Sequence, residues 1–531
     1  MTERGEVNVV RHYRRTLRPG WLYLNLLIAL AVLATSAPAQ TTVDLAKLDA
    51  YFAAASDQWK VPGFAVAVVK DDQVVFAKGY GLRTINGNER VDENTLFAIA
   101  SNTKAFTSAA LAKLVDEGKL GWDDRVIDHL PYFELYSPYV TQEMRVRDLL
   151  CHRAGLGTFS GDLVWYGTSY SREEVVRRIR HLPPAGSFRA DYGYSNVMFL
   201  AAGELIPAVS GRSWDEFVRT EFFEPLGMTR AITSVKSLER MANVATPHSE
   251  RDGRIVAFPW YSWDNAAPVG GIIASVSDMA KWLRLQLNYG TLNGKTYFSE
   301  SASRTMWTPH ISFTVSKESE ELYPTTHFRG YGLGWALMDY KGRKVIGHGG
   351  AYDGMFSRVT LVPEEKLGLV ILTNSTTSLP VALSYKILDA YLGGDEKDWS
   401  QEFLERSERS KQRWAEMWAK RDAERVANTR PSLPLEKYTG TYGGDMYGDA
   451  TVRVEKGRLV VEFAPNPALT GDLRHWHFDT FEVQWRHDFP WFGKGTVQFI
   501  MDNMGNVIEM KIDVPNEDFW FTELEFKKRK M

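Results

Sequence analysis

The sequence predicts an α+β fold, an antiparallel sheet flanked by helices, followed by a C-terminal all-β domain. Two strand-like runs near the start of the chain are joined by a short turn, and four more come late, with helical segments between the two groups. The runs do not alternate with helices as parallel βαβ units would require. Short alternating runs separated by Gly, Asn and Asp then fill the end of the chain, which predicts an all-β domain.

The composition is that of a globular protein with a large core. The chain has 531 residues, of which 44% are hydrophobic and 24% charged, so disorder is excluded as its main state. Lys and Arg number 63 against 66 Asp and Glu, and this balance lacks the basic excess of a nucleic-acid-binding protein. The single cysteine excludes a disulfide within the chain.

Residues 1–39 have the pattern of an export signal. A basic stretch precedes an apolar run over residues 21–34, and a small-x-small cleavage site follows at Ala37-Pro38-Ala39. The apolar run is shorter than the ~20 residues that a membrane-spanning helix needs. We therefore expect an exported protein, periplasmic or secreted. The alternative is an uncleaved segment that anchors the chain to the membrane.

The elements of the central region follow from hydrophobic periodicity. Residues 43–58 have the spacing of a helix, and Asp71-Asp72 joins the first two strands as a hairpin. The predicted strands of this region are 64–69, 74–78, 331–339, 343–348, 355–362 and 367–373. These residues belong to a predicted domain over 40–394.

A charged helix separates the two domains. Residues 395–431 are rich in charge and almost free of Gly until Pro431, so we expect a helical linker. The all-β domain then covers residues 432–531, as a barrel or a sandwich. Its predicted strands are 450–454, 459–463, 480–485, 496–501, 507–512 and 520–526.

The strongest chemical signal is Ser101-Asn102-Thr103-Lys104 at the start of a predicted helix. A serine and a lysine three residues apart stand on one helix face. A desolvated lysine can act as the base that a serine nucleophile needs, and the N–H groups at the helix start suit an oxyanion. Taken alone, this spacing is also that of a capping serine beside a surface lysine.

Two further motifs add groups of the right chemistry. Tyr194-Ser195-Asn196 supplies a phenol that can relay a proton and an amide that can bind a substrate amide. His348-Gly349-Gly350 closes a predicted strand, where glycines allow a substrate backbone to approach the strand edge.

In this order and spacing, the three motifs resemble the penicillin-recognising serine hydrolases, the superfamily of class C β-lactamases, DD-peptidases and related esterases. Residues 149–156, 268–275 and 372–374 are similar to the family as well. The resemblance implies a sheet domain with an all-helical subdomain and no cofactor. It also implies site roles, with Ser101 as the acylated nucleophile, Lys104 as its base, Tyr194 as a proton relay, Asn196, His348, Gly349 and Gly350 as substrate-binding residues, and the N–H groups of Ser101 and Ala351 as the oxyanion hole.

His348 departs from the K-T-G motif of many members. A histidine is only partly charged at pH 7, and Gly349 has no hydroxyl, so recognition of a substrate carboxylate is weakened. We therefore expect a hydrolase of amides or esters, with a small-molecule or short-peptide substrate such as cell-wall material. The alternatives are a class C-type β-lactamase and a catalytically silent penicillin-binding or peptide-sensing protein.

Three other features have structural interpretations. Cys151 precedes His152, but a neighbour in sequence need not act as the base of a thiolate, so we expect Cys151 to be structural. His475 and His477 share a strand face, yet two ligands are too few for a closed metal site. Residues 435–442 resemble the start of the lipocalin-like barrel that some family members append. The aromatic residues of this domain fit the interior of such a barrel or an aromatic-lined face.

Overall fold

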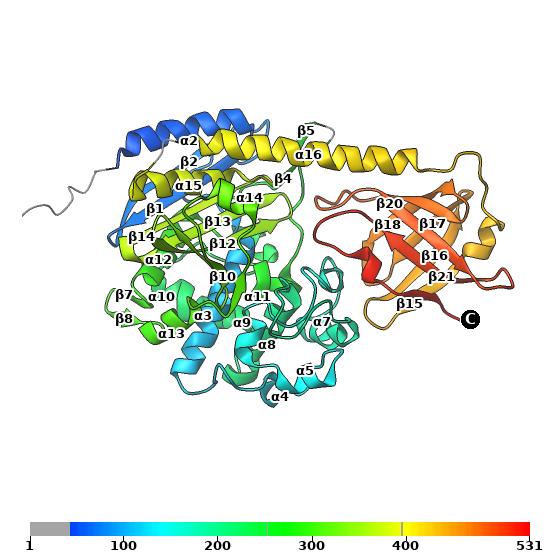
Figure 1. Ribbon diagram of the computed structural model, residues 1–531, viewed down its shortest axis with the longest axis horizontal. Helices are drawn as coiled ribbons and strands as arrows, with labels where there is room; N and C mark the ends of the chain where they lie inside the picture. The colour runs from blue at the N-terminus through cyan, green and yellow to red at the C-terminus, as the bar shows by residue number, and fades with distance from the viewer. Residues whose placement is uncertain (1–42, 252, 395–396, 531) are drawn as a thin grey trace, which may run out of the picture. The chain divides into compact units, whose positions relative to one another are not determined.

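The computed structural model describes residues 43–251, 253–394 and 397–530 (Figure 1). The helices and strands described here lie in the compact unit Leu45–Met531. The predicted signal peptide over residues 1–39 lies outside the described residues. Within those residues, no helix is long and apolar enough to cross a membrane.

An eight-stranded antiparallel sheet forms the centre of the first domain, which confirms the predicted α+β class. Its strand order joins the N-terminal hairpin to the late strands through the pairing of β1 with β14. Asp71 and Asp72 both have positive φ (49° and 64°), as the hairpin turn requires. In spatial order the strands are β2 (Gln73–Gly81), β1 (Gly63–Lys70), β14 (Leu367–Thr373), β13 (Met355–Val362), β12 (Arg343–Tyr352), β11 (Ala336–Tyr340), β10 (Arg329–Tyr331) and β9 (Ile311–Phe313).

Helices cover the sheet, and Figure 1 shows α12 and α15 on opposite sides of it. The helix α12 (Val276–Leu287) packs against β1 and β14, whereas α15 (Leu379–Leu392) packs against β13 and β14. The helix α2 (Leu45–Trp59) contacts α15 and β2. Every strand residue of β14 is buried, as expected for a strand with helices on both faces.

A helical subdomain is inserted between β2 and β9. Its central helix α3 (Thr103–Asp116) is buried along most of its length and contacts α8 (Asn196–Ser210) and α11 (Ala267–Gly270). The other helices between β2 and β9 are α4 (Val126–His129), α5 (Pro138–Glu143), α6 (Val146–Leu149), α7 (Arg172–Arg178), α9 (Trp214–Val218), α10 (Glu224–Leu226) and α13 (Glu300–Met306), and α14 (Lys317–Leu322) lies between β9 and β10. Short ladders join β3 (Phe97–Ala98) to β6 (Ile273–Ala274), β4 (His248–Arg251) to β5 (Arg254–Ala257), and β7 (Thr291–Leu292) to β8 (Lys295–Thr296).

The C-terminal domain is a closed antiparallel barrel, which selects the barrel over the sandwich. Its strands are β15 (Gly440–Gly444), β16 (Gly448–Glu455), β17 (Arg458–Phe463), β18 (Asn466–His477), β19 (Thr480–Trp485), β20 (Gly495–Met501), β21 (Val507–Asp513) and β22 (Phe526–Lys528). The helix α16 (Trp399–Ala423) precedes it, within the predicted linker.

Two predicted strands are wrong in detail. The run 331–339 is split, because Gly334 has a φ of +80° and lies so close to α3 that a Cβ would meet Ser108 Oγ at 2.5 Å. The run 520–526 is mostly irregular, with a 3₁₀ turn over Phe521–Glu523. Phe521 and Leu524 are both buried, and their spacing of three residues fits that turn rather than a strand.

Candidate active site

The serine and the lysine of the first motif are in contact. Ser101 lies in a 3₁₀ turn (Ala100–Asn102) that leads directly into α3, and Ala100 has an unusual positive φ of 48° just before it. Lys104 Nζ lies 2.9 Å from Ser101 Oγ and 3.1 Å from the carbonyl oxygen of Val269. Ser101 stays partly exposed while Lys104 is fully buried beneath it.

Burial decides the charge of Lys104. Desolvation holds the pKa of the ammonium well below its ordinary value, although the carboxyl of Asp162 opposes the shift. The rings of Tyr194 and Phe199 lie 4.9 and 5.5 Å from Nζ. A neutral amine in this position can accept the proton of the Ser101 hydroxyl.

Tyr194 lies on the other side of the serine, in the loop before α8. Its side chain hydrogen-bonds to Ser101, yet burial raises the pKa of the phenol well above its ordinary value. At neutral pH Tyr194 is therefore a neutral phenol that can pass a proton on. Because burial lowers the pKa of Lys104 and raises that of Tyr194, Lys104 is the better candidate for the base.

His152 holds the Tyr194 loop in place. Its Nδ1 accepts a hydrogen bond from the backbone N–H of Ser195 at 3.0 Å, and its ring centroid lies 4.1 Å from that of Tyr194. Gly193 packs so tightly that a Cβ there would lie 1.8 Å from Leu156 O. Both contacts help to position Tyr194.

Asn196 begins α8 and presents an acceptor. Its Nδ2 donates to Asp162 Oδ2 at 2.6 Å, while its Oδ1 is buried and has no hydrogen-bond partner among the described residues. Asp162 also accepts from Trp165 Nε1 at 3.0 Å, and burial raises the pKa of its carboxyl to about 8. The free Oδ1 suits a substrate N–H. Sequence reasoning missed Asp162, because no motif contains it.

The strand β12 brings the third motif to the serine. Its ladder with β11 ends at Gly347, so the edge from His348 onward is not paired with β11. Gly350 packs against the turn that holds the nucleophile, where a Cβ would lie 2.5 Å from Ile99 O and 2.9 Å from Ser101 N. The backbone of this strand and the N–H of Ser101 are thus adjacent, as an oxyanion hole shared with Ala351 would require.

His348 is neutral and fully engaged. Burial lowers the pKa of its imidazole to about 3. Its Nε2 accepts from the Tyr331 hydroxyl at 2.7 Å, and its Nδ1 donates to the carbonyl oxygen of Gly349. A neutral imidazole with both nitrogens bonded offers no charge to a substrate carboxylate.

These residues face one cavity of about 270 Å³. Seven of the eight site residues predicted from sequence line it, and the eighth, Lys104, lies beneath Ser101. The cavity is lined by Ser101, Phe159, Asp162, Trp165, Tyr194, Asn196, Trp263, His348, Gly349, Gly350, Ala351, Phe356, Trp491, Asp518 and Phe519. The last three come from the barrel domain. No sequence signal indicated them, because the path of a loop across another domain leaves no local pattern.

Direct hydrogen bonds hold the barrel against the loop that follows His152. Glu523 accepts from Ser160 Oγ at 2.5 Å and from the N–H of Gly161 at 2.9 Å. Trp520 Nε1 donates to the carbonyl oxygen of Thr158 at 2.8 Å. The walls of the cavity are therefore fixed by both domains.

The other chemistry-bearing residues have different surroundings. Cys151 is buried, and desolvation raises the pKa of its thiol to about 12, so it is unreactive at neutral pH. No group of three or more possible metal ligands is found among the described residues. His475 Nε2 instead donates a hydrogen bond to the carbonyl oxygen of Phe478 at 3.0 Å.

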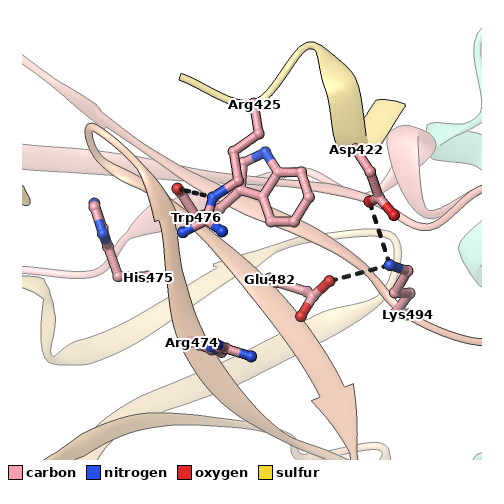
Figure 2. Close-up of a pocket in the computed structure, with 7 residues that line it drawn as sticks. All are labelled: Asp422, Arg425, Arg474, His475, Trp476, Glu482 and Lys494. Atoms are coloured by element: carbon pink, nitrogen blue, oxygen red, sulfur yellow. Dashed lines mark hydrogen bonds and ion pairs between the residues drawn. The ribbon is translucent and has the colours of Figure 1, made fainter. Parts of the chain in front are cut away.

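A second cavity, of about 300 Å³, lies where the end of α16 meets the barrel (Figure 2). Lys494 lies 3.4 Å from the carboxylates of both Asp422 and Glu482. Arg425 donates to the carbonyl oxygen of Trp476 at 2.8 Å and lies over its ring. These contacts join the helix to the barrel.

The chain is similar to known proteins. A relative, the unguisins hydrolase ungD of Aspergillus violaceofuscus, is 29% identical in an alignment of 426 residues that covers 73% of this chain and 73% of its own. Among solved structures, the octameric penicillin-binding protein homologue from Pyrococcus abyssi has a TM-score of 0.60 at 23% identity and covers 91% of this chain and 100% of its own. A D-stereospecific amidohydrolase from Streptomyces sp. has a TM-score of 0.52 at 24% identity, covering 66% and 99%. The two structures establish likeness of fold.

Two family models match the chain. Residues 424–528 match a domain of unknown function, which contains the barrel strands. Residues 48–392 match the β-lactamase model, and this match covers more than half of the chain and contains the three motifs. The chain therefore belongs to the β-lactamase family.

Proposed function

We propose that the protein is a serine hydrolase that cleaves an amide or an ester through an acyl-enzyme on Ser101. The observation that carries the proposal is the 2.9 Å contact between Ser101 Oγ and a buried Lys104 whose pKa is held low. Together with the phenol of Tyr194, it supplies a base and a proton relay at a partly exposed hydroxyl. The name of the fungal relative, a hydrolase, supports the same reaction class.

The proposed reaction has two halves. Lys104 takes the proton of Ser101 as Oγ bonds to the substrate carbonyl carbon, and the N–H groups of Ser101 and Ala351 bind the oxyanion. Collapse breaks the bond to the leaving nitrogen or oxygen, which receives a proton by way of Tyr194. A water then attacks the acyl group, giving a proton to the same base, and Ser101 regains its own. Both halves use side chains, the backbone N–H groups of the oxyanion hole and water.

The electrostatics of the site favour a peptidase or an esterase over a β-lactamase. A β-lactam substrate carries a carboxylate, but the described residues that line the cavity include no Lys or Arg, and His348 is neutral. Asn196 Oδ1 is free to accept a substrate N–H, which favours an amide. The Streptomyces protein of similar fold is an amidohydrolase, which is in line with that choice.

The test is a substrate panel measured with the full-length protein and its Ser101→Ala variant. The panel holds p-nitrophenyl acetate, alanine p-nitroanilide in both enantiomers and nitrocefin. We expect turnover of the ester or an anilide to exceed that of nitrocefin and to disappear in Ser101→Ala. Turnover that survives in the variant would overturn the nucleophile, and nitrocefin as the fastest substrate would favour a β-lactamase.

We also propose that the protein acts outside the cytoplasm on a small molecule or short peptide. The support is the basic stretch, apolar run and cleavage pattern of residues 1–39. N-terminal sequencing of the protein from a cell fractionation would find a chain starting near residue 40 in an exported fraction. A full-length chain in the cytoplasmic fraction would contradict it.

A further inference from the structure

The barrel places a carboxylate inside the cavity that holds Ser101. Asp518 lines this cavity together with Ser101 and Tyr194. Its side chain is largely desolvated, which raises the pKa of the carboxyl to about 6. Within the described ranges 43–251, 253–394 and 397–530, no hydrogen bond or ion pair to this carboxylate is found. A desolvated carboxylate without a partner is costly, so its place beside a nucleophile points to a ligand.

The other titratable groups of the cavity leave Asp518 uncompensated. Both oxygens of Asp162 already accept hydrogen bonds, from Trp165 and Asn196. His348 is neutral, and Lys104 is buried below the serine with its pKa lowered. Near the strand, the Arg358 guanidinium lies 3.9 Å from the position that a Cβ on Gly349 would take, but Arg358 does not line the cavity.

The charge of Asp518 acts on the reaction centre. Burial is the main cause of the raised pKa of both Tyr194 and Asp162, and the negative charge of Asp518 adds to the rise of each. Aromatic side chains line the same cavity as Asp518, among them Trp491 and Phe519. A carboxylate in an aromatic pocket is the arrangement that binds an organic ammonium group, through an ion pair and cation–π contacts.

The segment that carries Asp518 is ordered by its own hydrogen bonds. Asn516 Oδ1 accepts from the N–H of Asp518 at 3.0 Å and from that of Phe519 at 2.5 Å. Asn516 Nδ2 donates to the carbonyl oxygens of Val514 and Phe519, both at 2.7 Å. The carboxylate is thus held in position before a ligand arrives, which lowers the entropy lost on binding.

We propose that Asp518 binds an ammonium group of the substrate, so that the cavity takes amine-bearing acyl compounds and disfavours those with a carboxylate. The inference rests on the proposed function, whose substrate class it names. The barrel is then a part of the substrate-binding site rather than an independent module.

Binding is tested with three probes that differ in one group: 4-phenylbutylamine, 4-phenylbutanol and 4-phenylbutanoate. Isothermal titration with the full-length Ser101→Ala variant measures their affinity without any turnover. We expect the amine to bind more tightly than the alcohol, and the acid to bind most weakly. Asp518→Asn in the same background should weaken the amine on the order of 10- to 100-fold, as for a lost hydrogen bond to a charged group, and leave the alcohol within about twofold.

Glu517 provides the matched control, because it is the adjacent residue, is exposed and carries the same charge. Glu517→Gln should leave the amine affinity within about twofold, since an exposed charge contributes little. An amine that binds no better than the alcohol, or not at all, would overturn the inference. So would an Asp518→Asn variant that binds the amine as well as its parent.

A kinetic comparison separates this inference from the proposed function. Alanine p-nitroanilide and its N-acetyl derivative differ only in the ammonium group, and the wild-type protein should prefer the free amine by at least about tenfold in kcat/KM, a preference that Asp518→Asn removes. If Asp518→Asn lowered kcat/KM equally for both substrates, the role of Asp518 in binding the ammonium group would be overturned, while the proposed serine hydrolase would stand. Loss of the proposed function would appear instead as turnover that is insensitive to Ser101→Ala.

Discussion

At the scale of single residues, Lys104 and Tyr194 have different roles because burial lowers the pKa of the amine and raises the pKa of the phenol. Desolvation favours the neutral form of each group, which makes the amine a base and the phenol an acid. Lys104→Arg keeps a long basic side chain, but the guanidinium cannot lose its proton. We expect it to slow acylation of Ser101 by about 10²–10⁴-fold, measured as burst kinetics with p-nitrophenyl acetate. An arginine variant as fast as the wild type would show that Lys104 is not the base.

Gly350 and Gly349 differ in what a methyl group would meet. At Gly350 the added carbon would lie 2.5 Å from Ile99 O and 2.9 Å from Ser101 N, whereas at Gly349 the nearest atom is 3.5 Å away. We expect Gly350→Ala to shift the nucleophile and lower its labelling rate by a fluorophosphonate on the order of 100-fold. Its melting temperature should also fall. Gly349→Ala should melt within a degree or two of the wild type, roughly the shift expected of a change below 1 kcal/mol.

At the scale of elements, the motifs that stand at the start of a helix or on a strand could be predicted from sequence. The contact of Ser101 with Lys104 follows from their three-residue spacing across the 3₁₀ turn and the start of α3, and the glycines after His348 follow from close approach to a strand. The fold class was predictable because the strand runs are periodic. Asp162 and Asp518 could not be predicted, since Asp162 begins a short 3₁₀ turn and Asp518 lies in a loop, and the path of both segments depends on tertiary contacts.

Asp518, in the loop between β21 and β22, should make the binding of amines depend on pH. The Asp518 carboxyl has a raised pKa of about 6, so it is charged at pH 7.5 and largely protonated at pH 5. An alkylammonium keeps its charge over this range. We expect the affinity for 4-phenylbutylamine to fall about tenfold between pH 7.5 and pH 5.

Two comparisons isolate that titration. Asp353 also has a raised pKa of about 6, but both its oxygens are bonded, by Tyr166 and Trp263. If the titration of Asp353 changed ligand binding in general, the affinity for 4-phenylbutanol would change with pH as much as the affinity for 4-phenylbutylamine. A pH dependence that is the same for amine and alcohol, or that persists in Asp518→Asn, would refute the assignment to Asp518.

At the scale of the whole molecule, the barrel and the hydrolase domain share one substrate cavity. The helix α16 is tied to the hydrolase domain by Trp399, whose Nε1 donates to Asp389 at 2.6 Å, and to the barrel by Arg421, 3.0 Å from Asp513. Closer to the cavity, Glu523 and Trp520 bond directly to the loop 158–161. Both sets of contacts therefore hold the barrel residues in the wall of the cavity.

Weakening the direct contacts should let larger substrates enter the cavity. A Glu523→Ala, Trp520→Ala double variant removes hydrogen bonds that contribute about 1–3 kcal/mol each, while the serine and lysine stay in place. We expect kcat/KM for p-nitrophenyl octanoate to rise relative to that for p-nitrophenyl acetate. Arg453→Ala, which removes a surface ion pair to Glu462 on the barrel, serves as the control. An unchanged ratio in the double variant would show that the barrel does not limit the substrate.

The most direct test of the account is the mass of the intact protein after a brief incubation with p-nitrophenyl acetate and an acid quench. The account predicts a single acetyl adduct that peptide mapping places on Ser101, that is absent in Ser101→Ala and that forms far more slowly in Lys104→Arg. An adduct on another residue, or acetylation that is unchanged in Ser101→Ala, would contradict it.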